Sequence, residues 1–275
     1  MIRGVEFADF SVRELSLSAL ERCGVYISPV TFWAYQKEIG CNGPRRGKRL
    51  RKGRGNKPDT DCVGGPNQLW SWDITHLPAG RPHGFWYLYA LQDWFSRKVV
   101  AWLITDSLHS REVRELWDLG LLNEGLLLRP SWQWPGSLSD RGSQMRSISA
   151  KRYFKKLGVA QLFARPRTPN DNPKVEALFS VVKTEPEYPG VFPAIEVAGA
   201  YFEEFLAWYN GGHPHTALKM LTPRQAHSGR GEEILKARRR IRGATLQKRR
   251  AFFETGEEVE VEGKESLFLR EFPMR

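Results

Sequence analysis

The sequence predicts an α/β protein whose mixed β-sheet is flanked by helices. Three β-rich runs, at residues 69–77, 84–94 and 97–105, follow one another closely, as the strands of an antiparallel meander do. Helical and strand-like segments alternate along the chain after them, which favours helices packed on the faces of the sheet. The length of 275 residues suffices for one sizeable core and a smaller appendage, and a hydrophobic content of 41% is typical of a globular protein.

The first 42 residues predict a small helical region. Residues 11–24 have an amphipathic pattern and residues 28–40 form a second short segment, so the pair fits a helix-turn-helix and a plain helical hairpin equally well. Residues 43–60 follow as a linker rich in Gly, Arg and Lys. Its high positive charge favours an arm that contacts phosphates over a merely solvated linker. The candidate DNA-binding residues of this arm are Arg45, Arg46, Lys48, Arg49, Arg51 and Lys52.

Two elements are predicted directly after the meander. Residues 110–126 form a helical pattern, with Ser110 in the position of an N-cap. The segment that leads to Asp140 predicts a poor strand, because Pro135 and Gly136 interrupt it.

The remaining regular segments are mainly helical. A helix at residues 148–158 and a short strand at residues 159–164 come first. An amphipathic helix at residues 194–210 and a helical turn near residues 222–227 follow later. Residues 229–275 form a basic C-terminal extension, whose last part fits a hairpin without a motif of its own.

Between these segments, residues 165–185 combine a stiff, cationic lead-in with a helix. Pro173 suits the first helical turn and Asn172 is a natural cap before it. Glu176 and Lys183 lie seven residues apart and therefore share one stripe of the helix. The residues expected to pack into the core are Val175, Leu178, Phe179 and Val182.

Charge and cysteine usage narrow the class of protein. The chain has 42 Lys and Arg against 31 Asp and Glu, a formal net charge of +11, which favours a polyanionic partner. No apolar run approaches the length of a membrane span, so no membrane partner is expected. The three cysteines form no CxxC pair, which favours a reducing compartment and a cytoplasmic, nucleoid-associated protein. These cysteines are Cys23, Cys41 and Cys62.

Three acids occupy positions from which a strand or helix would present them. Asp73 lies within a strand-like run, where aspartate is disfavoured and where burial without a partner is costly. Asp140 follows a strand end, and Glu176 lies one turn into its helix. A lone acid in any of these places is ordinarily a cap or an exposed side chain. Together, the three would suit Mg²⁺ or Mn²⁺, which prefer carboxylate oxygens.

The pattern resembles a known family. Asp73, Asp140 and Glu176, with thirty-five residues between the last two, match the D, D-35-E pattern of DDE recombinases of the retroviral-integrase superfamily. Within that superfamily, the amino-acid sequence is most similar to insertion-sequence transposases of the OrfB type. Five blocks carry this resemblance in the expected order: NQLWSWDITHLP, YLYALQDWFSRKVVAW, SDRGSQM, RPRTPNDNPKVEALFSVVKTE and FLAWYNGGHPHTALKMLTPRQAH.

The resemblance implies an RNase H-like core with a mixed five-stranded sheet over residues 61–228. It also implies DNA cleavage and strand transfer by a two-metal mechanism, with Asp73, Asp140 and Glu176 as catalytic residues that hold two Mg²⁺ or Mn²⁺ ions. Lys183 matches the basic residue that the family places seven residues after the glutamate. DNA is the implied partner, bound by a homo-oligomer, and an upstream partner protein would supply end recognition. The remaining candidate DNA-binding residues are Arg165, Arg167 and Lys174.

Other readings stay open beside this one. A degenerate or domesticated relative would only bind DNA, although retention of the three acids argues against it. A cellular RNase H-like nuclease gains no support from the basic arm. Two further acids are expected to be structural, Asp93 at a strand end and Asp171 in the turn that it bonds. The pair His213 and His215 favours packing or phosphate contact over a metal site.

Overall fold

The structure, a computed structural model, describes residues 10–38, 58, 60–81, 84–165 and 171–255. The chain divides into two compact units. One unit comprises residues 49–210, and the other combines residues 1–48 with residues 211–275. The basic arm lies outside the described residues, as do Cys41, Arg167 and the segment expected to form the last hairpin. Within the described residues, none of the helices combines the length and the apolar character that a membrane crossing demands.

The unit of residues 49–210 is built on a five-stranded sheet with the order β3-β2-β1-β4-β5. β1 (Leu69–Pro78), β2 (Phe85–Asp93) and β3 (Val99–Thr105) form the predicted antiparallel meander. β4 (Gly136–Ser139) runs parallel to β1, and β5 (Gln161–Phe163) runs parallel to β4. This mixed sheet confirms the predicted RNase H-like fold class.

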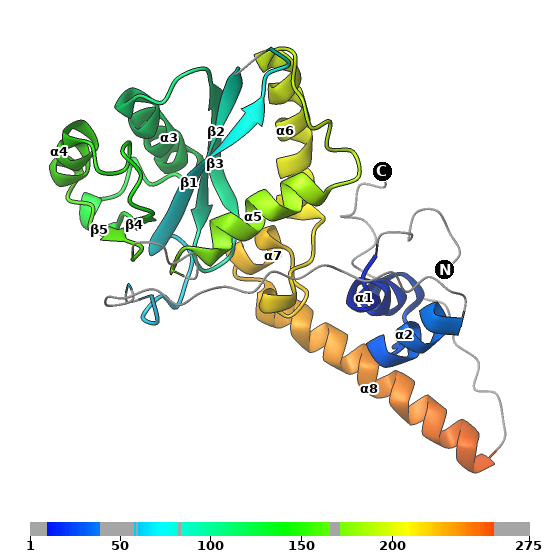
Figure 1. Cartoon of the computed structure of the whole chain (residues 1–275). Coiled ribbons are helices and arrows are strands. Elements are labelled where there is room, and N and C mark those ends of the chain that lie inside the picture. Colours follow the sequence, from blue (N-terminus) through cyan, green and yellow to red (C-terminus); the bar gives the residue numbers. More distant parts are fainter. Residues whose placement is uncertain (1–9, 39–57, 59, 82–83, 166–170, 256–275) are drawn as a thin grey trace. The chain divides into compact units, whose positions relative to one another are not determined.

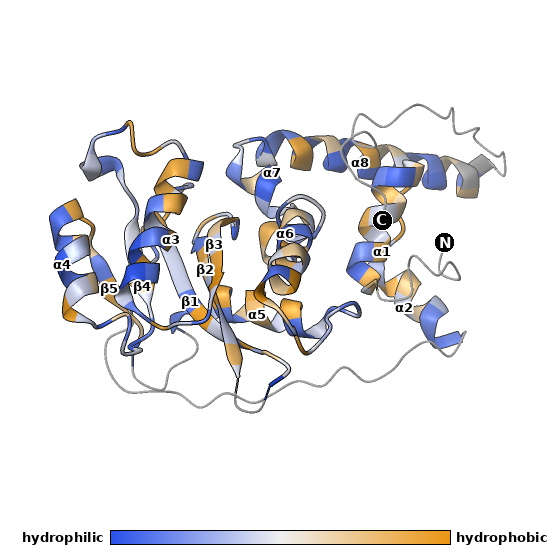
Figure 2. Ribbon diagram, turned by 90° about the horizontal axis from the view of Figure 1, so that it is seen from above, coloured by the Kyte–Doolittle hydropathy of each residue, from blue (hydrophilic) through white to orange (hydrophobic). Residues whose placement is uncertain are grey.

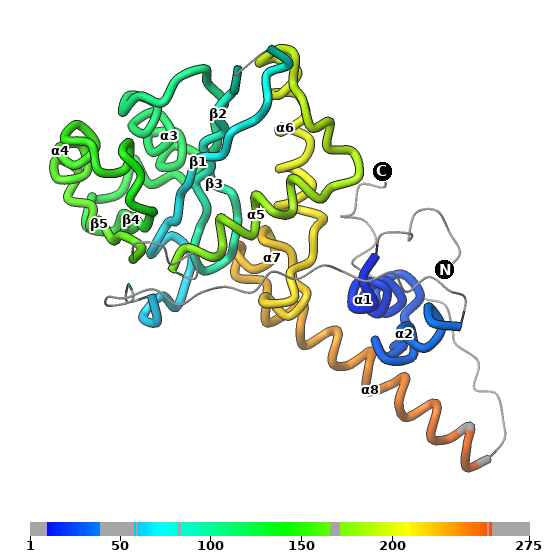
Figure 3. Tube along the Cα trace, in the orientation of Figure 1, coloured from blue at the N-terminus to red at the C-terminus, as the bar shows by residue number. Residues whose placement is uncertain are grey.

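Helices cover both faces of the sheet (Figure 1). α3 (Ser110–Asn123) and α4 (Ile148–Leu157) pack on one face, over a core that includes Trp70, Trp72 and Trp117. α5 (Pro173–Thr184) and α6 (Ile195–Gly211) pack on the other. The chain trace in Figure 3 shows the same two layers. A short 3₁₀ helix at Ser131–Gln133 precedes β4.

The expectation of a poor strand around Pro135 is confirmed, because residues 131–133 form a 3₁₀ helix and β4 begins only at Gly136. The strand that leads to Asp140 is nevertheless not interrupted, because Pro135 lies ahead of β4, where its missing N–H removes no ladder bond. The Gly136 amide donates to the Gln68 carbonyl at 2.9 Å. A Cβ at this glycine would stand 3.2 Å from a methyl group of Leu69, so the absence of a side chain lets the two strands approach.

Two expected helix caps are wrong. Ser110 is the first residue of α3 rather than its cap, because the helix begins after His109, whose side chain makes no capping bond. The hydroxyl of Ser107 instead donates to Glu112 in the first turn of this helix, at 2.7 Å. Asn172 occupies the cap position of α5, but its side chain does not cap the helix. It donates to the Trp72 carbonyl of β1 at 3.4 Å, so a tertiary bond replaces the expected local one.

The second unit is helical in the part that the structure describes. The predicted N-terminal helices are present as α1 (Val12–Cys23) and α2 (Pro29–Glu38). The later segments are a 3₁₀ turn at Thr216–Leu218, then α7 (Pro223–His227) and α8 (Gly231–Thr255). α8 was not predicted, because the sequence there shows a basic stretch without a clear apolar face.

Candidate active site

Two of the predicted acids lie on neighbouring parallel strands. In the pairing of β1 with β4, Ser71 stands beside Leu138. Continuing this register by two residues places Asp73 beside Asp140, which directly follows the last residue of β4. Since neighbouring strands are about 4.8 Å apart, the backbones that carry these two aspartates run side by side.

The third acid comes from the helical layer on the same side. Side chains alternate between the two faces of a strand. Trp72 packs under α3 and α4, whereas Leu77 packs under α5 and α6, so Asp73 belongs to the face that α5 covers. Glu176 lies in the first turn of α5, as predicted.

The three acids share one electrostatic environment. The pKa of Asp73 is raised to about 7, first by burial and then by the charges of Asp140 and Glu176. The backbone amide of Ile74 and the charge of Lys183 act in the opposite direction. Burial also raises the pKa of Glu176, and the charge of Asp140 adds to this effect. The site therefore disfavours three ionised carboxylates, and a bound cation would relieve their repulsion.

The donor set fits a hard cation by its chemistry. All three groups are carboxylates, which Mg²⁺ and Mn²⁺ prefer. One oxygen of Asp73 accepts the Ile74 amide at 2.8 Å, and one oxygen of Asp140 accepts the Gly142 amide at 2.8 Å. In the part of the chain that the structure describes, no group of three His, Cys, Asp or Glu side chains is arranged to hold a metal ion. Close convergence of the three carboxyls stays a prediction.

The start of α5 is fixed at two points. Asn172 bonds to the carbonyl of Trp72, the residue before Asp73. The ammonium of Lys174 donates to the Trp94 carbonyl and lies 3.9 Å from the centroid of the Trp94 ring. Burial lowers the pKa of Lys174 to about 8. Lys174, which was predicted to bind DNA, is thus engaged within the protein.

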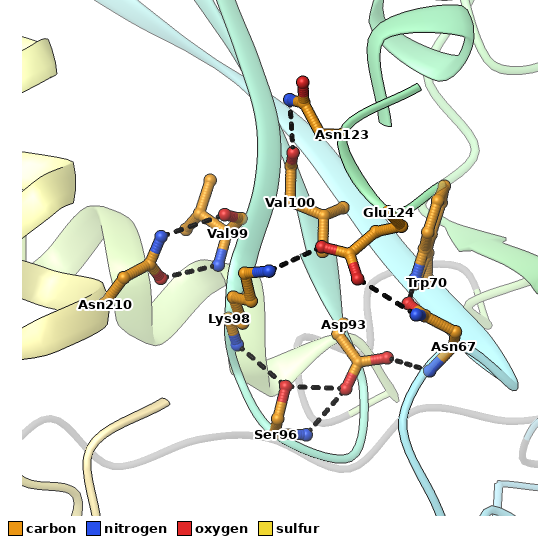
Figure 4. A network of polar contacts seen from close by, with 10 residues as sticks. All are labelled: Asn67, Trp70, Asp93, Ser96, Lys98, Val99, Val100, Asn123, Glu124 and Asn210. Carbon is orange, nitrogen blue, oxygen red and sulfur yellow. Dashed lines mark hydrogen bonds and ion pairs between the residues drawn. The ribbon is translucent and has the colours of Figure 1, made fainter. Parts of the chain in front are cut away.

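A polar network holds the turn after β2 (Figure 4). The buried carboxylate of Asp93 accepts from the Asn67 amide, the Ser96 amide and the Ser96 hydroxyl, each at 2.7 Å. The Asn67 side chain donates to Glu124, which also accepts from Lys98 at 2.6 Å. Asp93 therefore has the structural role expected of it at the end of a strand. Its local partner Ser96 is only three residues away, whereas Asn67 is 26 residues away in the chain and could not be identified from a local pattern.

A second structural acid holds the loop that leads to α5. Buried Asp171 accepts from the Arg165 backbone amide and from the guanidinium, with all three contacts at 2.8 Å. The expectation that Asp171 bonds its own turn is confirmed. The guanidinium of Arg165, predicted to contact phosphates, forms an ion pair with this carboxylate.

The other predicted residues have simpler surroundings. Lys183 is exposed in the last turn of α5. In the second unit, the rings of His213 and His215 meet edge to face with centroids 4.7 Å apart. Burial lowers the pKa of His213, and His215 is 8% exposed, as packing side chains would be.

Sequence comparisons identify the family of the core. Two integrase core domain families match the chain, one over residues 64–169 and the other over residues 157–223. A transposase of insertion sequence IS904 from Lactococcus lactis is 26% identical over 58% of this chain. A probable transposase of IS1353 from Shigella flexneri is 29% identical over 53% of it. The chain covers 60% of the first relative and 27% of the second.

Solved structures of related type have low similarity to this chain. The intasome of a simian T-cell lymphotropic virus, in complex with a PP2A regulatory subunit, is 18% identical. The structural match has a TM-score of 0.47 and covers 68% of this chain and 62% of the viral chain. The magnesium-bound HTLV-2 integrase catalytic core is 17% identical. The structural match has a TM-score of 0.43 and covers 59% of this chain and 97% of the integrase core. The chain belongs to the integrase core domain family and is a relative of insertion-sequence transposases.

Proposed function

We propose that the chain is a DDE transposase that cleaves DNA and transfers strands with two Mg²⁺ or Mn²⁺ ions. The observation that supports this most is the placement of Asp73 beside Asp140, on the face of the sheet that α5 with Glu176 covers. The charges of Asp140 and Glu176 raise the pKa of Asp73 accordingly. These acids come from β1, the end of β4 and the first turn of α5. When bound, two such ions would activate a water molecule and stabilise the leaving phosphate oxygen.

Each residue has a distinct task in this proposal. Asp73, Asp140 and Glu176 would hold the ions, and we expect their carboxyls to lie about 4–8 Å apart in the metal-free protein. Lys183 lies seven residues after Glu176 on α5, so the two side chains project from the same side of the helix. Its ammonium group would bind a DNA phosphate near the metal site. The start of α5, fixed by Asn172, keeps Glu176 beside β1.

DNA is the proposed substrate, as both element end and target. The net charge of +11 supports a polyanionic substrate. α1 and α2 provide a candidate DNA-binding region, and the basic arm at residues 43–60 provides another. A homo-oligomer on DNA, with an upstream partner protein for end recognition, completes the proposal. The boundaries of the core at residues 61–228 and of the extension at 229–275 remain part of it.

Asp140→Asn tests the mechanism. Full-length protein is incubated with Mn²⁺ and duplexes that carry the DNA flanking the gene, and cleavage and binding are measured separately. The variant should cleave slower by about two orders of magnitude or more, because a carboxylate needed by the ions is lost, while DNA binding survives. Asp106→Asn is the matched control, since Asp106 is an exposed acid after β3. Equal cleavage by wild type and Asp140→Asn would reject the mechanism.

The same assay addresses the alternative that the chain only binds DNA. A wild-type protein that binds the duplexes but never cleaves them, with either ion, would favour a degenerate relative. The charges of Asp140, Glu176 and Lys183 all act on the pKa of Asp73, which favours the active enzyme.

A further inference from the structure

The inner face of α8 is fully committed to the helical unit. Ile234 and Thr245 are buried at helical spacing on this face. Arg238, on the same stripe, pairs with Glu21 of α1 and donates to the Met220 carbonyl at 3.0 Å. This ion pair is almost completely buried, with 9% and 10% of the side chains exposed.

A second set of contacts fixes how α8 is rotated about its own axis. The Tyr26 amide donates to the Thr245 hydroxyl at 3.3 Å, and Arg249 donates to the Tyr26 carbonyl at 2.7 Å. The Arg242 guanidinium lies 4.7 Å from the centroid of the Tyr26 ring. These bonds hold one face of α8 inward and leave the opposite face outward.

The outward face of α8 is a cationic stripe. With 100° per residue, Lys236, Arg239, Arg240 and Arg250 project opposite Ile234, and each of the four is exposed. No acid occurs between residues 236 and 250, although Glu232 in the first turn lies 3.9 Å from Arg239. The stripe spans about 21 Å along the helix. Figure 2 shows the hydrophilic colour that recurs along α8.

A glycine lies in the middle of this stripe. Glycine is unfavourable within a helix, by about 1 kcal/mol relative to alanine. Packing against the described residues does not explain Gly243, because a Cβ built there would meet none of their atoms within 4 Å. Among the described residues the position therefore carries a cost without a packing benefit, and it leaves the helix surface at residue 243 itself free of a side chain.

We propose that this stripe, the outward face of α8 at Lys236, Arg239, Arg240, Gly243 and Arg250, binds the phosphate backbone of duplex DNA. The four cations match a row of phosphates by charge, and Gly243 lets the backbone approach the helix closely. DNA is chosen as the polyanion because of the proposed function. EDTA removes the metal ions that the proposed cleavage requires, but it leaves DNA binding measurable. Failure of the binding proposal can therefore be distinguished from failure of the proposed cleavage.

The first test measures the affinity of the full chain for a duplex of about three helical turns, or about 30 bp, across a salt titration in EDTA. The triple variant Lys236→Gln, Arg240→Gln, Arg250→Gln should flatten the slope of log affinity against log salt by about 2.7, or 0.9 per lost contact. The matched control removes three exposed cations from α4, as Lys151→Gln, Arg152→Gln, Lys155→Gln. The control should keep the wild-type slope.

Equal flattening in both triple variants would assign the effect to net charge and overturn the proposal. An unchanged slope in the α8 variant would also overturn it. Loss of binding to anionic lipid vesicles, with DNA binding intact, would assign the stripe to lipid headgroups instead.

A second test uses the size of the side chain at position 243. Gly243→Ala and Gly243→Leu should both raise the thermal midpoint of unfolding, because each favours the helix. DNA affinity should nevertheless fall several-fold from Gly to Ala to Leu, at unchanged salt slope. Loss of folding cannot explain weaker binding by a more stable variant. Undiminished affinity in Gly243→Leu would show that no backbone approaches α8 there.

Discussion

The Lys174 ammonium lies 3.9 Å from the centroid of the Trp94 ring and also donates to the Trp94 carbonyl. Lys174 belongs to the first turn of α5, two residues before Glu176. Trp94 directly follows Asp93, whose buried network holds the turn after β2. The contact thus ties the helix that carries one candidate ligand to a turn of the sheet that carries another.

Lys174→Met removes a cation–π contact and a charged hydrogen bond, but it also removes the burial cost that lowers the pKa of Lys174. The free energy of unfolding should therefore change by no more than about 1–2 kcal/mol. A purely structural role predicts only this change. If Lys174 also positions Glu176, the Lys174→Met variant should need more Mn²⁺ than the wild type to reach half of the metal-induced rise in thermal midpoint. Lys156→Met, at an exposed position of α4, is the control and should change neither quantity. An unchanged Mn²⁺ requirement in Lys174→Met would limit the residue to stability.

Asp73→Asn should stabilise the protein in a pH-dependent way. The pKa of Asp73 in the folded state is about 7, above its ordinary value of 3.8. Ionisation therefore costs stability, which is lost as the pH rises between these two values. The variant should gain a few degrees in thermal midpoint at pH 8 and much less at pH 5. Equal gains at both pH values would contradict the assigned burial.

The same variant separates charge repulsion from metal binding. Added Mg²⁺ should raise the thermal midpoint of the wild type at pH 8, because ligand binding to the folded state stabilises it. Asp73→Asn should show little of this rise, since it lacks one carboxylate. Calorimetric titration with Mg²⁺ provides an independent measurement. Equal Mg²⁺ affinity in both proteins would remove Asp73 from the proposed ligands.

Arg165→Met should destabilise the protein without changing how DNA binding depends on salt. Its ion pair with buried Asp171 is lost and the carboxylate stays buried without its cation, so the midpoint of chemical denaturation should fall. A residue that contacts phosphate would instead change the salt slope by about one unit. Chemical denaturation and a salt titration decide between these roles. A flattened slope with unchanged stability would restore the phosphate contact predicted from the sequence.

Lys183 and the basic arm should differ in their effects. Deleting residues 45–57 should flatten the salt slope by several units, since each phosphate contact contributes about 0.9. Lys183→Ala should change the slope by only about one unit and should alter the rate or position of cleavage more strongly. An unchanged slope after the deletion would make the arm a plain linker. Wild-type cleavage by Lys183→Ala would make that lysine a solvated side chain.

Local patterns predicted the sheet and the places of the three acids well. Residues 69–77 alternate between apolar and polar side chains, and the two runs after them are rich in residues that favour strands. These local patterns suffice to predict the meander. Asp73 within β1, Asp140 after β4 and Glu176 in α5 needed only these element assignments.

Features that depend on distant partners could not be predicted in this way. Asn172 was read as a cap because asparagine favours that position, but the Trp72 carbonyl competes for its amide. α8 showed no apolar face, because a buried arginine, Arg238, takes the place of an apolar residue on its inner stripe. Its partner Glu21 is 217 residues away, beyond the reach of any local pattern.

The bond between Tyr26 and Thr245 closes a loop of 219 residues, within which the whole sheet-containing unit is encoded. During synthesis, the segment from β1 to α6 can therefore fold before α8 has been made and can contact α1 and the Tyr26 segment. Loop-closure entropy grows only slowly with length, but contacts so far apart in sequence form late. Pulsed hydrogen exchange during refolding should find the amides of β1 protected before that of Tyr26. A chain truncated after α6 would contain a folded core, but its N-terminal helices would lack the contacts that α8 makes with them.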